Sequence, residues 1–189
     1  MSPEQQKSIT PGPDGTPVPP GTSVIRLEKL PAPNGDADSL LQQGKAWPGL
    51  FILSSADKKR RPPRLSVWLT ALTSVAQAWA RRPVSRVVCT LGVDAMREVA
   101  AEAEAHRSTT RSLDVEWEKA VRVVDGLEVP DELPGHEGHC GITGLGDDNG
   151  NKTQRELLRS ILADTVRPGD VTILTDADIA HFHAAATSA

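Results

Sequence analysis

The feature that most constrains the fold is that apolar residues come in short runs, most of them closed by proline or glycine. Residues Val24 to Leu30 alternate apolar and polar side chains, the pattern of a half-buried strand, and Pro31 ends the run. No run approaches the roughly 18 apolar residues that a membrane-spanning helix needs, so we expect a soluble protein with no membrane partner. Further strands are predicted at 50–53, 65–69, 87–91, 113–117, 121–124, around Ile142 and at 171–174.

Between these runs lie segments with helical spacing and capping residues. They predict helices at 36–43, from Thr73 or Ser74 to Ala80, at 94–106, at 153–166 and at 176–186. At 189 residues the chain has the usual length of one domain. We therefore expect the α+β class, with a single mixed domain whose sheet has five or six strands and whose main helices number two or three.

The first 22 residues contain six prolines and three glycines with few apolar side chains. Such a segment buries too little surface to offset the entropy of ordering, so we predict a disordered arm at 1–22 and a globular domain at 23–189. The chain does not begin with a basic and apolar signal sequence, which favours a cytoplasmic protein. Arginine outnumbers lysine 14 to 7 and tyrosine is absent, a composition that suggests a GC-rich bacterial genome. Cys89 and Cys140 are expected to be free thiols.

Charge is distributed unevenly along the chain. Residues 1–89 carry 12 Lys and Arg against 6 Asp and Glu, whereas residues 90–189 carry 9 against 19. The two halves either neutralise one another in the fold or form two opposed faces, and the sequence leaves both arrangements open. A polarised surface favours a protein partner, which we expect to be encoded nearby.

A basic, proline-bearing segment joins the strands predicted at 50–53 and 65–69, which we expect to form a hairpin-like pair with a long exposed loop. Clustered cations of this kind bind phosphates or an acidic protein surface. Nucleic acid is the less favoured partner because the second half of the chain is acidic and Trp68 lies in a core-like alternating run. The candidate contact residues are Lys58, Lys59, Arg60, Arg61 and Arg64.

The segment 134–140 holds two histidines and a cysteine, which are side chains that zinc prefers. A zinc hydrolase helix needs histidines four residues apart, whereas these are three apart and flanked by glycines. The simpler interpretation is a glycine-lined turn that delivers Ile142 into the core, with no cofactor. The alternative, a small zinc enzyme, would use His136, His139, Cys140, His181 and His183, with Asp178 as a further ligand.

Three motifs in order, Leu65-Ser66-Val67-Trp68, Leu91-Gly92-Val93 and Gly138-His139-Cys140-Gly141-Ile142, resemble a loosely defined group of small uncharacterised bacterial proteins. In that group the last motif is similar to Pro-x-His-Ala-x-Ile, and here Cys140 stands at the alanine position and Gly138 before the histidine. The resemblance spans roughly residues 50–165 and implies no activity. It makes His139 the first histidine to test.

No catalytic motif is complete in the sequence: there is no Gly-x-Ser-x-Gly elbow, and the segment around Lys152 departs from a phosphate-binding loop. The sequence therefore favours a non-catalytic partner-binding or regulatory protein of a bacterial complex. The zinc enzyme and nucleic-acid binding through 58–64 are the alternatives.

Overall fold

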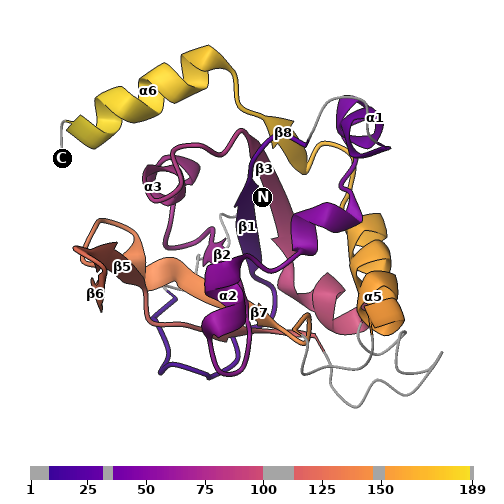
Figure 1. Cartoon of the computed structure of the whole chain (residues 1–189), viewed down its shortest axis with the longest axis horizontal. Coiled ribbons are helices and arrows are strands. Elements are labelled where there is room, and N and C mark those ends of the chain that lie inside the picture. The colour runs from indigo at the N-terminus through magenta and orange to yellow at the C-terminus, as the bar shows by residue number, and fades with distance from the viewer. Residues whose placement is uncertain (1–8, 32–35, 100–112, 147–151, 188–189) are drawn as a thin grey trace, which may run out of the picture.

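A computed structural model describes residues 9–31, 36–99, 113–146 and 152–187. Its centre is a six-stranded sheet in the order β4-β7-β2-β1-β3-β8, with every neighbouring pair antiparallel (Figure 1). Strands β5 and β6 form a separate hairpin. The strands span Ser23–Glu28 (β1), Leu65–Leu69 (β2), Val87–Gly92 (β3), Asp114–Trp117 (β4), Val121–Val124 (β5), Leu127–Pro130 (β6), His139–Thr143 (β7) and Val171–Ile173 (β8).

Helical segments cover both faces of the sheet. One core cluster joins alternate strand residues such as Val24, Val67 and Cys89 to α5, η1 and the helical residues 93–99. The second cluster, on the other face, joins Ile25 and Trp68 to α3 and α6. The helices are α1 (Asp36–Gln42), the 3-10 turns η1 (Pro48–Phe51) and η2 (His136–Gly138), α2 (Ser55–Lys59), α3 (Val75–Ala80), α5 (Lys152–Thr165) and α6 (Asp176–Thr187).

The mixed α+β class and the six-stranded sheet confirm the prediction from sequence. The expected strand at 50–53 is wrong, because Pro48 begins the 3-10 turn η1 and Leu50 and Phe51 pack into the core from it. The expected hairpin between 50–53 and 65–69 is wrong as well. Ser54 caps α2, which extends into the basic segment, so this connection is partly helical. Strand β2 pairs with β1 and β7 instead.

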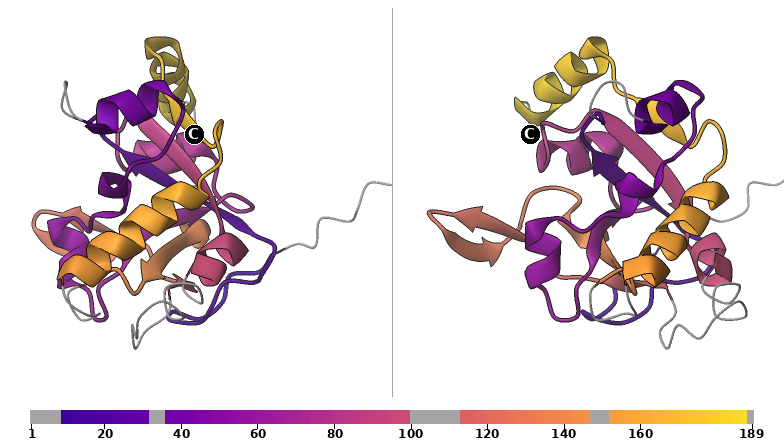
Figure 2. Two further views of the ribbon diagram at one scale, coloured as in Figure 1. Left: turned by 90° about the vertical axis from the view of Figure 1, so that its right-hand side faces the viewer. Right: turned by 45° about the vertical axis from the view of Figure 1, so that its right-hand side comes forward.

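The strand predicted at 121–124 is present as β5, and it forms a hairpin with β6 at 127–130, where the sequence predicts no strand. Asp125 and Gly126 both have positive φ, 51° and 81°, and form the two-residue connection between β5 and β6. This hairpin protrudes from the body of the molecule (Figure 2). The helix predicted at 94–106 is present over 93–99, and its remainder lies outside the described residues.

Part of the arm expected to be disordered belongs to the globular body. Residues 1–8 lie outside the described residues, but Val18 is 1% exposed and its amide donates to the Val115 carbonyl. Pro17 forms an isolated bridge with Glu116. Residues 9–22 therefore extend the structure beyond β4, the edge strand of the sheet.

The two oppositely charged halves interleave rather than separate. Ion pairs join them at Arg60 with Glu118, Arg64 with Glu116, and Arg86 with Asp176. In the sheet, strands of the second half flank those of the first. The sequence left two arrangements open, and these ion pairs correspond to the one in which the charges of the two halves neutralise one another.

Within the described part of the chain, no helix has the length and apolar character that a membrane span requires.

Candidate functional site

Strand register brings three side chains together on one face of the sheet. Trp68 of β2 pairs with His139 of β7, and the amide of Glu118, just after β4, donates to the His139 carbonyl. The rings of Trp68 and His139 lie 4.5 Å apart between centroids. On the other side, His139 Nε2 is 3.8 Å from Glu118 Oε2. These residues form a row across β4, β7 and β2.

The C-terminal end of α3 covers this row. The Arg81 guanidinium lies 4.7 Å from the Trp68 ring centroid, a cation–π contact. Its Nε donates to Asp131 at 2.5 Å, and its two terminal nitrogens donate to the carbonyls of Leu133 and Pro134. Ser74 caps α3 through a reciprocal bond with Gln77, so the helix that carries Arg81 starts at a defined position.

Two arginines from the α2–β2 connection approach the same face. Arg60 forms an ion pair with Glu118, and Arg64 pairs with Glu116 at 2.9 Å and with Asp14 at 3.3 Å. Gly141, on β7, has no side chain and therefore leaves space for Arg64 and Glu118. A Cβ at this position would lie 2.7 Å from Arg64 Cβ and 3.1 Å from Glu118 Oε2.

Burial strongly affects the protonation states of the ionisable side chains in and beside this row. It lowers the pKa of His139 to about 3, with the Arg60 charge acting in the same direction, so the imidazole is neutral at pH 7. Burial also raises the pKa of Glu118, although the Arg60 guanidinium offsets part of this effect. For Asp131, burial is outweighed by hydrogen bonds from Arg81 and the Leu133 amide, and its pKa is lowered.

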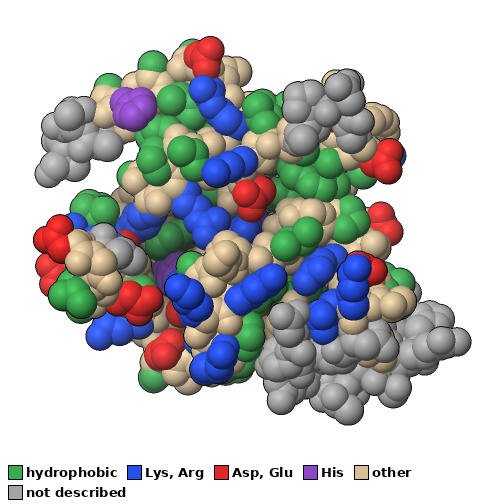
Figure 3. Space-filling model, viewed as in Figure 1, with side chains coloured by type: hydrophobic (Ala, Val, Ile, Leu, Met, Phe, Trp, Pro, Cys, Tyr) green, Lys and Arg blue, Asp and Glu red, His purple; other side chains and the backbone are tan. Residues whose placement is uncertain are grey.

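A cavity of about 420 Å³ opens over Trp68 and His139. Figure 3 shows Lys and Arg side chains around a hollow between α2, α3 and the β5–β6 hairpin. We call this cavity the arginine pocket and define it by Arg60, Arg81, Arg82, Arg122, Trp68 and His139.

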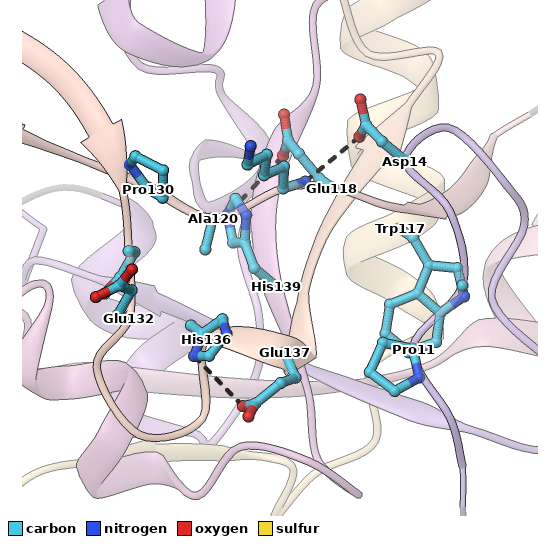
Figure 4. Close-up of a pocket in the computed structure, with 13 residues that line it drawn as sticks. Pro11, Asp14, Trp117, Glu118, Ala120, Pro130, Glu132, His136, Glu137 and His139 are labelled. Carbon is cyan, nitrogen blue, oxygen red and sulfur yellow. Dashed lines mark hydrogen bonds and ion pairs between the residues drawn. The ribbon is translucent and has the colours of Figure 1, made fainter.

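A second cavity, of about 500 Å³, adjoins it. Ala120, Asp131 and His139 line both cavities and therefore form the wall between them. Figure 4 shows the second cavity, in which the Glu118 carboxylate lies beside the His139 imidazole. We call it the acidic pocket and define it by Asp14, Glu118, Glu132, Glu137, His136 and His139.

The histidine–cysteine segment does not gather its zinc-type side chains. In the extended strand β7, the His139 ring packs against Trp68 at a tilt of 44° on one face, while Cys140 belongs to the core cluster on the other. Burial raises the pKa of the Cys140 thiol to about 12, which disfavours the thiolate that binds metal. His136 lies on η2, where its Nδ1 is 3.1 Å from the Leu133 carbonyl.

The C-terminal histidines lie apart from this segment. His181 and His183 belong to α6, which packs on α3, and the His183 ring meets Trp79 edge-on at 4.8 Å. Figures 1 and 2 show α6 and β7 at opposite ends of the molecule. Asp178 accepts from the Thr175 amide at the start of α6. Within the described part of the chain, no three His, Cys, Asp or Glu side chains are placed to hold a metal ion.

The five basic candidates have different surroundings. Lys58, Lys59 and Arg61 are exposed, and Arg61 donates to the backbone carbonyls of Lys58 and Arg60. Arg64 is buried in ion pairs. Of these residues only Arg60 lines the arginine pocket.

Sequence reasoning did not identify most of the side chains of this site. They are scattered along the chain, and no spacing motif links the neighbouring pair Arg81 and Arg82 with Glu118, Arg122 and Asp131. One signal was available: Glu118 continues the alternation of the 113–117 strand, with Val115 and Trp117 facing the core.

Comparisons of the chain with protein-family models, with curated proteins and with solved structures give no match, so the candidate site is interpreted from its geometry alone.

Proposed function

We propose that this protein is a non-catalytic component of a protein complex that binds an acidic segment of another protein through the arginine pocket. The observation that supports the proposal is the convergence of Arg60, Arg81, Arg82 and Arg122 on one cavity whose lining includes a single carboxylate, Asp131. Arginine recognises carboxylates through two parallel hydrogen bonds.

The charge balance of the pocket favours an anionic ligand. Arg60 is paired with Glu118 and Arg81 with Asp131. Among the described residues, Arg82 and Arg122 have no side-chain ion pair. Two positive charges therefore remain for a ligand: Arg82 is half-buried, Arg122 is exposed, and both line the cavity beside the buried Trp68 and His139.

An acidic protein segment fits these surroundings better than a nucleic acid. The arginine pocket adjoins the acidic pocket, whose carboxylates repel a continuous phosphate backbone. The net charge of −4 acts in the same direction. A carboxylate side chain needs only the enclosed cavity, whereas a nucleic acid needs an extended basic track.

The test is calorimetric titration at low salt with a short peptide of alternating Glu and Ser, compared with the same peptide carrying Gln for Glu. We expect binding of the Glu peptide only, with an affinity that falls as salt is added. In the double variant Arg82→Gln/Arg122→Gln the affinity should fall at least about tenfold, or roughly 1.4 kcal/mol. Arg167→Gln is the matched control, because Arg167 is exposed and lies outside the pocket.

Two results would overturn the proposal. The first is equal affinity for the Glu and Gln peptides, or an equal loss in the pocket and control variants. The second is tighter binding of a single-stranded oligonucleotide than of the Glu peptide, with dependence on the same arginines, which would favour the nucleic-acid alternative instead.

A further inference from the structure

The acidic pocket has negative charge that the protein does not neutralise. Glu132 and Glu137 are exposed at the cavity. Within the described residues, Glu132 has no ion pair, and Glu137 pairs only with His136 at 3.6 Å, an imidazole that is charged only when protonated. The other carboxylates that line this cavity, Asp14, Glu118 and Asp131, are paired with Arg64, Arg60 and Arg81. Lys119 also lines the cavity, so its one positive charge stands against the two exposed glutamates.

His139, which lines the same cavity, carries a buried hydrogen-bond acceptor. The His139 side chain is 4% exposed, and its Nδ1 has no hydrogen-bond partner in the described part of the structure. Because the imidazole is neutral, it carries one proton, and the Glu118 carboxylate 3.8 Å from Nε2 favours the proton on that nitrogen. Nδ1 is then an acceptor without a donor, which is a costly state for a buried group.

The remaining walls suit an aliphatic chain. Trp117, Pro11, Pro130 and Ala120 line the cavity. In Figure 4 the Trp117 and Pro11 rings lie on one side, and Glu132 and Pro130 lie on the other. A flexible alkyl stem with a positively charged end matches apolar walls that carry carboxylates and one buried acceptor.

We propose that the acidic pocket binds a cationic side chain, arginine or lysine, of a protein partner. Its N–H group donates to His139 Nδ1, and its charge lies near Glu132 and Glu137. The site differs from the arginine pocket in place and in the sign of the ligand, so it goes beyond the proposed function. Because His139 is part of the wall between the two pockets, one segment with neighbouring acidic and basic side chains can fill both.

The experiment is calorimetric titration with a short peptide of alternating Arg and Ser, compared with the same peptide carrying citrulline, the neutral isostere of arginine. We expect the Arg peptide to bind at least tenfold more tightly. The double variant Glu132→Gln/Glu137→Gln should lose at least tenfold in affinity for it. Glu98→Gln is the matched control, because Glu98 is an exposed carboxylate on the helical residues 93–99, outside the pocket.

A second variant tests the acceptor. His139→Phe keeps a ring against Trp68 but removes Nδ1. We expect this variant to bind the Arg peptide more weakly than the wild type does. Thermal melting checks that the variant is folded. Equal affinity for the Arg and citrulline peptides, or unchanged binding in Glu132→Gln/Glu137→Gln, would overturn the inference. Arg82→Gln/Arg122→Gln should leave Arg-peptide binding intact, so this inference and the proposed function fail independently.

Discussion

His139 occupies an unusual position for an ionisable residue. It is buried on one face of the sheet, with its ring tilted against Trp68. The Glu118 carboxylate lies on its other side and is ion-paired to the Arg60 guanidinium. Burial keeps its ring neutral, so the residue serves as a hydrogen-bonding group rather than a charge at pH 7.

The stability of the protein should report this burial. The folded-state pKa of about 3 lies below the ordinary value of 6.5, so between these values only the unfolded chain takes up the proton. Acidification therefore destabilises the fold. When the pH is lowered from 7 to 5, urea unfolding should show that the wild type loses about 2 kcal/mol more than His139→Phe.

The comparison with His139→Phe is needed because other groups titrate with the opposite sign. The raised pKa of Glu118 means that the folded state takes up its proton first, which favours folding as the pH falls through that value. This contribution is present in both proteins. Equal losses of stability in both would show that His139 is protonated in the folded state at pH 5.

Gly141 is required by close packing at the same site. We expect Gly141→Ala to lower the free energy of unfolding by about 1–3 kcal/mol, since the new methyl group meets Arg64 and Glu118. Gly92→Ala, in β3, is the control because its Cβ would make only an ordinary contact, 3.8 Å from Ala95 Cβ. Urea unfolding measures both, and a similar change in the two variants would contradict the prediction.

At the scale of elements, the arm 9–22 shows why composition alone is a poor guide to order. Its prolines and glycines bury little surface, yet Val18 enters the core and Asp14 pairs with Arg64. The arm also supplies Pro11 and Asp14 to the acidic pocket. A few long-range contacts therefore hold a segment whose local sequence favours disorder.

Val18 provides the test of this attachment. Val18→Ala should cost about 2 kcal/mol of unfolding free energy, because it removes buried methyl groups from the core. The same substitution at Val84, which is 62% exposed, should cost less than about 0.5 kcal/mol. If Val18→Ala were as mild as Val84→Ala in chemical denaturation, the arm would contribute nothing to stability.

At the scale of the whole molecule, the sheet interleaves the two halves of the chain. Strands β1 and β2 come from the first half, and β3 spans the boundary between the halves at residue 89. These three strands lie centrally, while β4, β7 and β8 come from the second half and flank them. The opposite charges of the halves meet across these strands, as in the pair of Arg64 with Glu116. Neither half has a complete sheet without the other.

This arrangement predicts one cooperative unfolding transition. Far-ultraviolet circular dichroism and tryptophan fluorescence should give coincident urea transitions for the full chain. Fragments 1–92 and 93–189 should each lack stable structure alone, because the strands that complete the sheet of each fragment lie in the other. Separate transitions, or a folded fragment, would show that the halves are independent units.

Much of the fold could be read from local patterns. The strands at 87–91 and 171–174 follow from short apolar runs, and the Ser74-capped helix follows from its capping residue; both signals depend on neighbouring residues. The prediction of a strand at 50–53 was wrong for a physical reason. A short apolar run is compatible with a strand or a buried turn, and Pro48 together with contacts to α5 decides for the turn.

The local pattern of the chain thus determined the α+β class and most strand and helix positions, and the resemblance of the motif at 138–142 singled out His139. Only the tertiary structure decided that His139 lies beside Glu118 and Trp68, that Cys140 faces away, and that arginines from three segments meet at one cavity. Periodicity and capping act over a few residues, whereas the pairing of distant strands depends on the packing energy of the whole sheet. A site assembled by strand register therefore leaves no continuous motif in the sequence.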